Sequence, residues 1–302
     1  MSIRLIIHPG ETVTNVEAKD NYQVALDGYV PREPFHDEKN KVINFNHHEL
    51  VNRLATRATC AQVLVAIRQG MMDIFRVKNE ITVDVHVNDC DQDVCLSWFL
   101  IKNHHLVVHA ANPMINRLVH MEDMLDSCGG TYPFDRDTPM LKELAWIFQP
   151  YTLFRLSGGI ERRNCEEFKN VIDSVCQRIM SYMTGNTNAI DLDIQYEVQY
   201  RSPTWSMIQE HGKDDRMAYW SEGIRAFVAY RINKDKYTYT IGRMSQFVQF
   251  DIPGLINDLN AMESGWGGSD TIGGSPRGIG SYITPTEMVK IVNKFLSVND
   301  GT

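Results

Sequence analysis

The sequence predicts an α/β fold in two domains, and three observations support this class. Apolar and polar residues alternate from Ile81 to Val87, which is the period of a half-buried strand. Three aspartates follow that strand, and an apolar helical run over residues 94–101 comes directly after them. From residue 188 onward the chain is rich in β-branched and aromatic residues at the spacing of strands. The patterning therefore changes from mixed α/β to β-rich along the chain.

This change suggests a domain layout. We expect a first domain over residues 1–155, a linker helix within residues 156–189 and a second domain over residues 190–302. The first domain is expected to be a mainly parallel sheet with helices on both faces, and the second a smaller α+β domain. With 302 residues the chain can bury a core in each. The active site is expected in the cleft between them.

The elements of the first domain follow in order. Short strands are expected within residues 1–30, and a polar, Pro-rich loop follows over residues 31–41. The segment VINFNHHE then forms a short strand that delivers His47 and His48. Helical spacing predicts further helices, among them residues 50–75, with an end or a kink near Gly70, and residues 114–125 and 161–183.

The second domain is expected to begin with strands. Residues 189–200, 224–232 and 236–244 have strand composition, and NKDK forms a hairpin turn between the last two. Helices are expected over residues 250–262 and 286–296, and the glycine-rich stretch 265–281 separates them.

Composition and charge restrict the class of partner. The net charge of −8 argues against a protein that coats long nucleic acids. No apolar run approaches the length of a membrane span, and the N-terminal run is too short for a signal peptide. The six cysteines form no CxxC pair, so we expect reduced thiols in a cytoplasmic protein. A homodimer is left open as the oligomeric state.

The three aspartates predict a metal site. Asp89, Asp91 and Asp93 occupy alternate positions at the carboxyl end of a strand, where open α/β sheets place their ligands. Like charges this close repel unless a cation neutralises them. Mg²⁺ or Mn²⁺ is the simplest candidate, because such ions take oxygen ligands. The alternative is a solvated turn in which Asp93 is the helix N-cap.

Other polar residues extend this candidate site. His47 and His48 end a strand and point in different directions, so one can bind metal while the other meets substrate. Asp27 also ends a strand, although Asp-Gly is usually only a turn. Glu122, Asp123 and Asp126 share a helix, for which a charged face is the plainer interpretation of at least two.

The glycine-rich stretch 265–281 is a candidate anion site. Glycines let backbone N–H groups approach an anion closely, and Arg277 within the stretch and Arg243 before it can clamp that anion. The stretch contains no Gly-Lys-Ser/Thr sequence, so it is not a Walker A motif. The alternative is a surface loop without a ligand.

Together these segments resemble the DHH phosphoesterase superfamily, which includes RecJ-like nucleases, nanoRNases and family II pyrophosphatases. The segments VHVNDCDQDVCLSWFL, NFNHHE and ALDGYVP are similar to three of its motifs, and HMEDMLDSCGG is a looser match to a fourth, with Asp123 as its aspartate. The segment GGSPRGIGS resembles the glycine motif of the family's second domain. Here the histidine motif precedes the aspartate motif, and Asn46, Val94 and Ser275 replace the family's usual aspartate, small residue and histidine.

The resemblance implies a phosphoesterase that uses Mn²⁺ or Mg²⁺ and acts on a nucleotide or short oligonucleotide. It implies metal ligands at Asp27, His47, Asp89, Asp91, Asp93 and Asp123. His48 and Asp91 would be catalytic, and the substrate-binding residues would be Arg243, Gly273, Gly274, Ser275 and Arg277. One alternative is a non-catalytic protein that binds a phosphorylated ligand on the same fold. Another is a zinc or redox site built on His86, Cys90 and Cys95.

Overall fold

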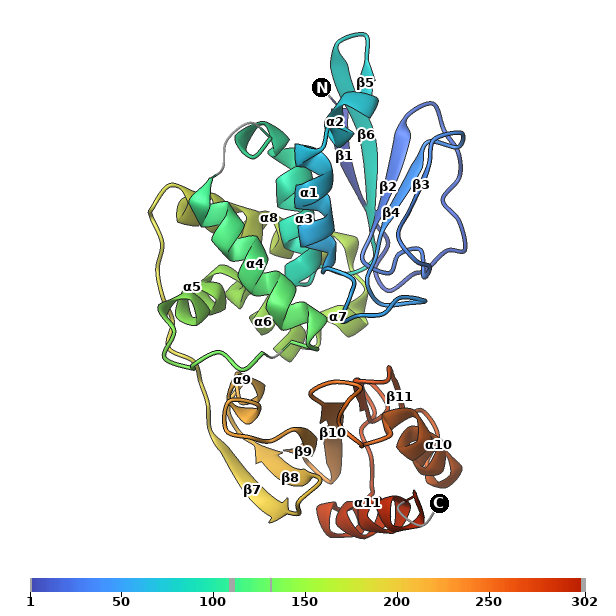
Figure 1. The fold of residues 1–302 in the computed structure, drawn as a ribbon, viewed down its shortest axis with the longest axis vertical. Coiled ribbons are helices and arrows are strands. Elements are labelled where there is room, and N and C mark those ends of the chain that lie inside the picture. Colours follow the sequence, from blue (N-terminus) through green and yellow to red (C-terminus); the bar gives the residue numbers. More distant parts are fainter. Residues whose placement is uncertain (1, 109–111, 131, 300–302) are drawn as a thin grey trace. The chain divides into compact units, whose positions relative to one another are not determined.

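The computed structural model describes residues 2–108, 112–130 and 132–299, and the chain forms two compact units (Figure 1). Unit 1 comprises Met1–Ser127 and Pro139–Ile190, and unit 2 comprises Cys128–Thr138 and Asp191–Thr302. The fold class is mixed α/β, as the sequence predicted, and each unit contains a mixed sheet.

The sheet of unit 1 has the strand order β1-β6-β2-β4-β3, with β5 beside β6. Strands β1, β2 and β4 join β6 in a parallel arrangement, whereas β3 and β5 pair antiparallel with β4 and β6. The bounds are β1 Ser2–Ile7, β2 Tyr22–Leu26, β3 Phe35–Asp37, β4 Val42–Phe45, β5 Arg76–Val77 and β6 Glu80–Val87.

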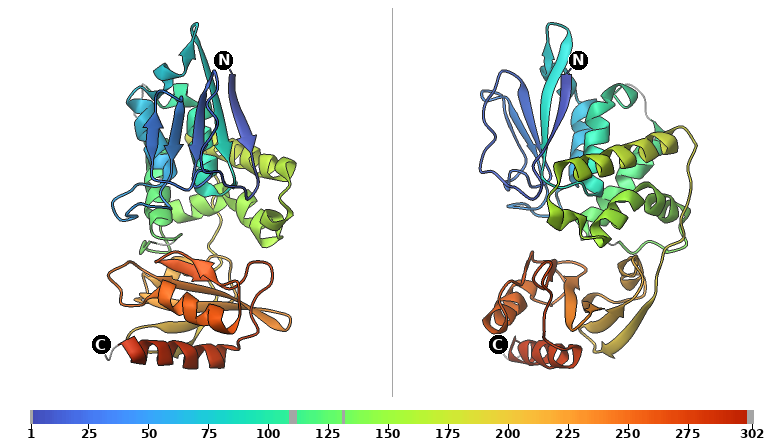
Figure 2. Two further views of the ribbon diagram at one scale, coloured as in Figure 1. Left: turned by 90° about the vertical axis from the view of Figure 1, so that its right-hand side faces the viewer. Right: turned by 180° about the vertical axis from the view of Figure 1, so that it is seen from behind.

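The two faces of this sheet differ in their cover. Val83 and Val85 point to one face of β6, and Asp84 and His86 point to the other. Figure 2 shows the helices of unit 1 on one side of the sheet. On the face that carries His86, Ala25 packs with apolar residues of loops and with Phe35 of β3. The expectation of helices on both faces is therefore wrong, because the alternation in β6 supplies an apolar surface for one helical layer.

The helices of unit 1 pack against one another. Their bounds are α1 Thr59–Arg68, α2 Met71–Ile74, α3 Gln92–Lys102, α4 Pro113–Ser127, α5 Pro139–Ile147, α6 Gln149–Leu156, α7 Gly159–Arg162 and α8 Cys165–Met183, with a 3₁₀ turn at His104–Leu106. Helix α8, the expected linker, buries a stripe at helical spacing and packs against α3 and α6. It belongs to unit 1.

Helix α1 is shorter than the periodicity suggested. The predicted helix over residues 50–75 begins only at Thr59, and Gly70 separates α1 from α2. Leu50 has a left-handed backbone with φ of 58°, which a helix does not accept. Residues 50–58 therefore connect β4 to α1 without helical structure.

Unit 2 is built on a sheet with the order β11-β12-β10-β9-β8-β7. Strands β8 and β9 are parallel, and the other neighbours are antiparallel. The bounds are β7 Tyr196–Arg201, β8 Ser206–Glu210, β9 Ala226–Asn233, β10 Lys236–Arg243, β11 Gly267–Gly268 and β12 Ile272–Gly274, with helices α9 Arg216–Tyr219, α10 Ile252–Met262 and α11 Pro285–Asn299. Residues of α10 and α11 share a core with one face of this sheet.

None of the helices in the described part of the chain combines the length and apolar character that crossing a bilayer requires.

Candidate metal centre

The candidate site lies at the carboxyl end of three adjacent parallel strands. Asp27 follows β2, the histidine pair follows β4, and the three aspartates follow β6. Strand β2 lies between β4 and β6, so all three motifs meet at one edge of the sheet. The unusual order of the motifs along the chain therefore does not keep them apart.

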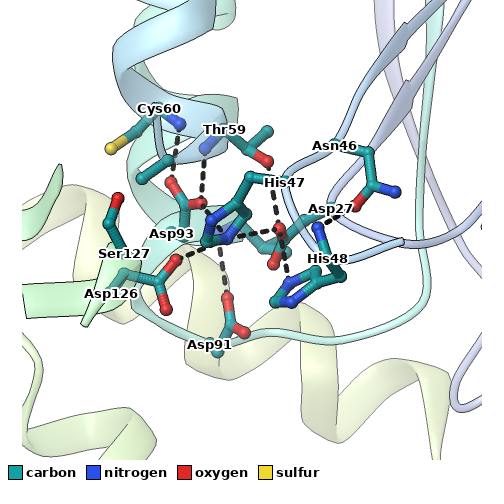
Figure 3. A network of polar contacts seen from close by, with 12 residues as sticks. Asp27, Asn46, His47, His48, Thr59, Cys60, Asp91, Asp93, Asp126 and Ser127 are labelled. Carbon is teal, nitrogen blue, oxygen red and sulfur yellow. Dashed lines mark hydrogen bonds and ion pairs between the residues drawn. The ribbon is translucent and has the colours of Figure 1, made fainter. Parts of the chain in front are cut away.

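His47 is the centre of this cluster (Figure 3). Its side chain is fully buried, and its Nε2 lies 2.7 Å from Asp126 Oδ2, 3.5 Å from Asp27 Oδ1 and 3.6 Å from Asp93 Oδ2. Within the described residues, neither ring nitrogen of His47 makes a hydrogen bond of acceptable geometry, and neither does Asp126 Oδ2. Three carboxylates thus converge on one buried imidazole nitrogen, which forms an ion pair with Asp126 only when it is protonated.

The turn after β2 brings Asp27 to the same place. Asp27 and Gly28 both have left-handed backbones, with φ of 50° and 83°, which aspartate and glycine accept more readily than most residues. Asp27 Oδ1 lies 3.0 Å from His48 Nε2 and accepts a hydrogen bond of 3.0 Å from Thr59 Oγ1. The side chain of His48 is 33% exposed, so the cluster reaches solvent on this side.

Asp93 and Asp91 have different roles at the start of α3. Asp91 is the N-cap, because its Oδ1 accepts from Val94 N at 2.9 Å. Asp93 is therefore not the N-cap, contrary to the alternative interpretation of this segment. Its two oxygens instead accept from the backbone N–H groups of Thr59 and Cys60, at 2.7 and 2.6 Å, on the neighbouring helix α1.

The remaining aspartate of the run, Asp89, lies in the loop between β6 and α3. Asp89 Oδ1 accepts from Cys90 N at 2.6 Å. Asp89 and Asp91 both contribute to the negative charge that raises the pKa of nearby Tyr151 beyond the effect of its burial. Asp27 and Asp93, by contrast, have oxygens within 3.6 Å of His47 Nε2.

Helix α4 contributes Asp126 to the cluster, whereas the family resemblance implied Asp123. Asp123 Oδ1 accepts from Ala58 N at 2.7 Å, and so holds the start of α1. The buried stripe of α4 includes Leu118, Glu122 and Leu125, and Asp126 lies one turn after Glu122 on that stripe. Helical spacing could therefore have identified Asp126, since a carboxylate on an apolar stripe points inward.

The cluster contains more buried acids than histidines, and the acids shift one another's pKa values. Burial alone would lower the pKa of His47, but the carboxylates of Asp126 and Asp27 outweigh it and raise that pKa to about 11. Burial and the charges of Asp27 and Asp126 raise the pKa of Asp93 to about 8. Burial also raises the pKa of Asp91 and Glu122 well above their usual ranges. A divalent cation would relieve this crowding of acids.

Two sets of ligand atoms suit such a cation. One atom from each of Asp27, His47 and His48 lies within 4.8 Å of the others, and so does one atom from each of His47, Asp93 and Asp126. The two sets share His47. The carboxylates suit Mg²⁺ or Mn²⁺, and the imidazoles suit a transition metal better than Mg²⁺, which prefers oxygen ligands and water. The residues present are therefore compatible with a divalent transition metal such as Mn²⁺.

Asn46 has a structural role beside the cluster. Its Nδ2 donates to Arg32 O and to Glu49 Oε2, both at 2.8 Å, and its Oδ1 accepts from His48 N at 3.1 Å. An aspartate could not make the two donations. Asn46 fixes the turn that carries His47 and His48, so its amide is used there and not as a ligand beside His47.

The predicted substrate residues of unit 2 mostly make internal contacts. A Cβ added at Gly273 would lie 2.6 Å from Ile256 Cδ1, and one at Gly274 would lie 2.6 Å from Tyr239 O. Both glycines belong to β12, where they allow this close packing.

Ser275 and Arg243, which were also predicted to bind substrate, form hydrogen bonds within unit 2. Ser275 Oγ accepts from Tyr239 N at 3.0 Å. Arg243 donates to Asp270 O at 2.6 Å and to Val248 O at 3.2 Å. Arg277 differs from both, because its side chain is exposed.

The zinc or redox alternative does not match the geometry. His86 faces away from the metal cluster, with its Nδ1 3.1 Å from His8 Nε2 and its Nε2 2.8 Å from Gln23 Oε1. Cys90 and Cys95 are free thiols, and burial raises the pKa of both, so they stay protonated. Protonated thiols are poor metal ligands.

Comparison with known proteins gives no relative: no protein-family model matches the chain, and no curated protein matches it significantly.

Proposed function

We propose that this protein is a metal-dependent phosphoesterase whose metal centre is built around His47. The observation that supports it most is the buried Nε2 of His47, which has carboxylate oxygens of three aspartates within 3.6 Å. The resemblance of the motifs to DHH phosphoesterases supports a phosphoester as the substrate class. In this proposal unit 1 is the DHH-like domain, with a mainly parallel sheet, and unit 2 is the associated substrate-binding domain.

The residues that would hold the ion are Asp27, His47, Asp93 and Asp126, and Asp89 and Asp91 lie on the neighbouring loop. When bound, an ion of this kind supplies an activated water and neutralises charge on the phosphoryl group. Of the two ions expected, Mn²⁺ suits this site better than Mg²⁺, because an imidazole is among the ligands.

His48 has the position of a substrate-contacting residue. Its side chain is one-third exposed, whereas that of His47 is fully buried. Burial opposes protonation of His48, but the charge of Asp27 outweighs it and raises the pKa of the imidazole. A protonated His48 would donate to a phosphoryl oxygen or to the leaving group.

Hydrolysis assays on metal-stripped protein test this proposal. A short dinucleotide and bis(p-nitrophenyl) phosphate serve as substrates, with Mn²⁺ added back. We expect Mn²⁺-dependent cleavage that Asp126→Asn lowers by at least about 100-fold, a larger loss than removal of an outer-sphere partner usually causes. Asp123→Asn is the matched control, because Asp123 holds Ala58 N and an amide oxygen can still accept that bond.

Two outcomes would count against it. Equal losses in the two variants would show that the effect comes from α4 as a whole and not from a ligand. Binding of the dinucleotide without cleavage would instead favour a non-catalytic protein that binds phosphorylated ligands.

A further inference from the structure

Thr59 connects the two ligand sets of the metal centre. It is fully buried and is the first residue of α1. Its backbone N–H donates to Asp93 Oδ2 at 2.7 Å, and its hydroxyl donates to Asp27 Oδ1 at 3.0 Å. These same two oxygens lie 3.5 and 3.6 Å from His47 Nε2. One residue therefore contacts a ligand from each set.

The local sequence explains why α1 depends on partners from other elements. The first N–H groups of a helix have no partner within it, and a Ser, Thr, Asp or Asn at the N-cap usually supplies one. Here the N-cap is Ala58, whose side chain has no acceptor. Asp123 accepts from Ala58 N, and Asp93 accepts from Thr59 N and Cys60 N. The helix start and Asp93 thus hold each other in place.

The hydroxyl of Thr59 acts on Asp27 in the same way. Asp27 Oδ1 also lies 3.0 Å from His48 Nε2, on the solvent side of the cluster. The hydrogen bond from Thr59 reaches Asp27 from the buried side. It therefore opposes a rotation of the carboxylate that would turn it toward His48 and away from His47. Threonine is branched at Cβ, so its side chain has few rotamers at the start of a helix and holds its hydroxyl in a fixed direction.

We propose that Thr59 is a positioning residue of the metal centre, which orients Asp27 through its hydroxyl and Asp93 through its backbone. This inference rests on the proposed metal centre. Outer-sphere partners of this kind usually change metal affinity by about 10- to 100-fold when they are removed. Serine keeps the hydroxyl, whereas valine keeps the shape and loses it.

Calorimetric titration of Mn²⁺ into the metal-stripped full chain tests this role without any need for activity. We expect Thr59→Val to weaken Mn²⁺ binding by about 10- to 100-fold, and Thr59→Ser to bind close to wild type. Thr82→Val is the matched control, because Thr82 lies in β6 five residues before the strand ends, roughly 16 Å along it.

The outcomes separate this inference from the proposed function. If wild type takes up no Mn²⁺, the metal centre itself is wrong. If wild type binds and Thr59→Val binds equally well, the metal centre stands and the positioning role is overturned. If circular dichroism shows that Thr59→Val is unfolded, Thr59→Ala removes the hydroxyl without adding volume. Wild-type affinity in that variant would overturn the role as well.

Discussion

The cluster around His47 and the glycine segment of unit 2 both contain residues typical of ligand sites, yet their polar atoms are used differently. In unit 1, the described residues leave both nitrogens of His47 without a hydrogen bond while three carboxylates face it. In unit 2, Ser275 is bonded to Tyr239, and Arg243 holds backbone carbonyls. Residue types alone therefore do not separate a ligand site from a packed segment.

The largest effect is expected at His47, because it belongs to both ligand sets. His47→Gln should weaken Mn²⁺ binding by more than about 100-fold, beyond the range for an outer-sphere partner. His48→Gln should weaken Mn²⁺ binding less, since His48 belongs to one set only. Calorimetry on both variants measures the difference. A greater loss for His48→Gln would place the ion on the solvent side and move the centre away from His47.

A smaller effect, and of a different kind, is expected at Gly274. A Cβ there would meet Tyr239 O at 2.6 Å, and a backbone atom cannot move aside easily. Gly274→Ala should lower the free energy of unfolding by about 1–3 kcal/mol, the usual cost of overpacking. Denaturant unfolding measures this, and the Mn²⁺ affinity should stay unchanged. A loss of Mn²⁺ affinity at full stability would show that the glycine segment belongs to the metal site.

The smallest effect on stability is expected at Arg277. Its exposed side chain should change the free energy of unfolding by no more than about 0.5 kcal/mol when Arg277→Ala removes it. Mn²⁺ affinity should also be unchanged. Dinucleotide binding should weaken if the guanidinium contacts a phosphate, because such a bond is charge-assisted. Unchanged dinucleotide affinity would leave the glycine segment without a role in binding.

Much of the candidate metal site could be predicted from strand ends. Period-2 alternation located β6, and an Asp-Gly turn and a histidine pair marked the ends of β2 and β4. Parallel pairing then brought these ends together, and the sequence could only suggest that pairing. Asp126 was missed because a charged helix face explained it equally well, and its inward direction follows from the buried stripe of α4.

Features that depend on tertiary contacts could not be predicted. The capping of α1 by Asp93 and Asp123 joins residues more than 30 positions apart, and no local pattern encodes it. Helix α8 has the amphipathic pattern of a linker helix and of a core helix alike, and only its packing on α3 and α6 decides between them. The same holds for Gly273 and Gly274, whose close neighbours are set by the sheet.

The central claim is tested most directly by calorimetric titration of Mn²⁺ into metal-stripped wild-type protein at several pH values. Without metal, the pKa of His47 is about 11 and that of Asp93 about 8, so both carry protons at pH 7. A metal ligand must lose its proton, so binding should release protons, and affinity should rise about tenfold per pH unit for each proton released. Affinity that rises between pH 6 and 9, with proton release to the buffer, is the predicted result. No binding, or an affinity independent of pH, would contradict a metal centre at His47.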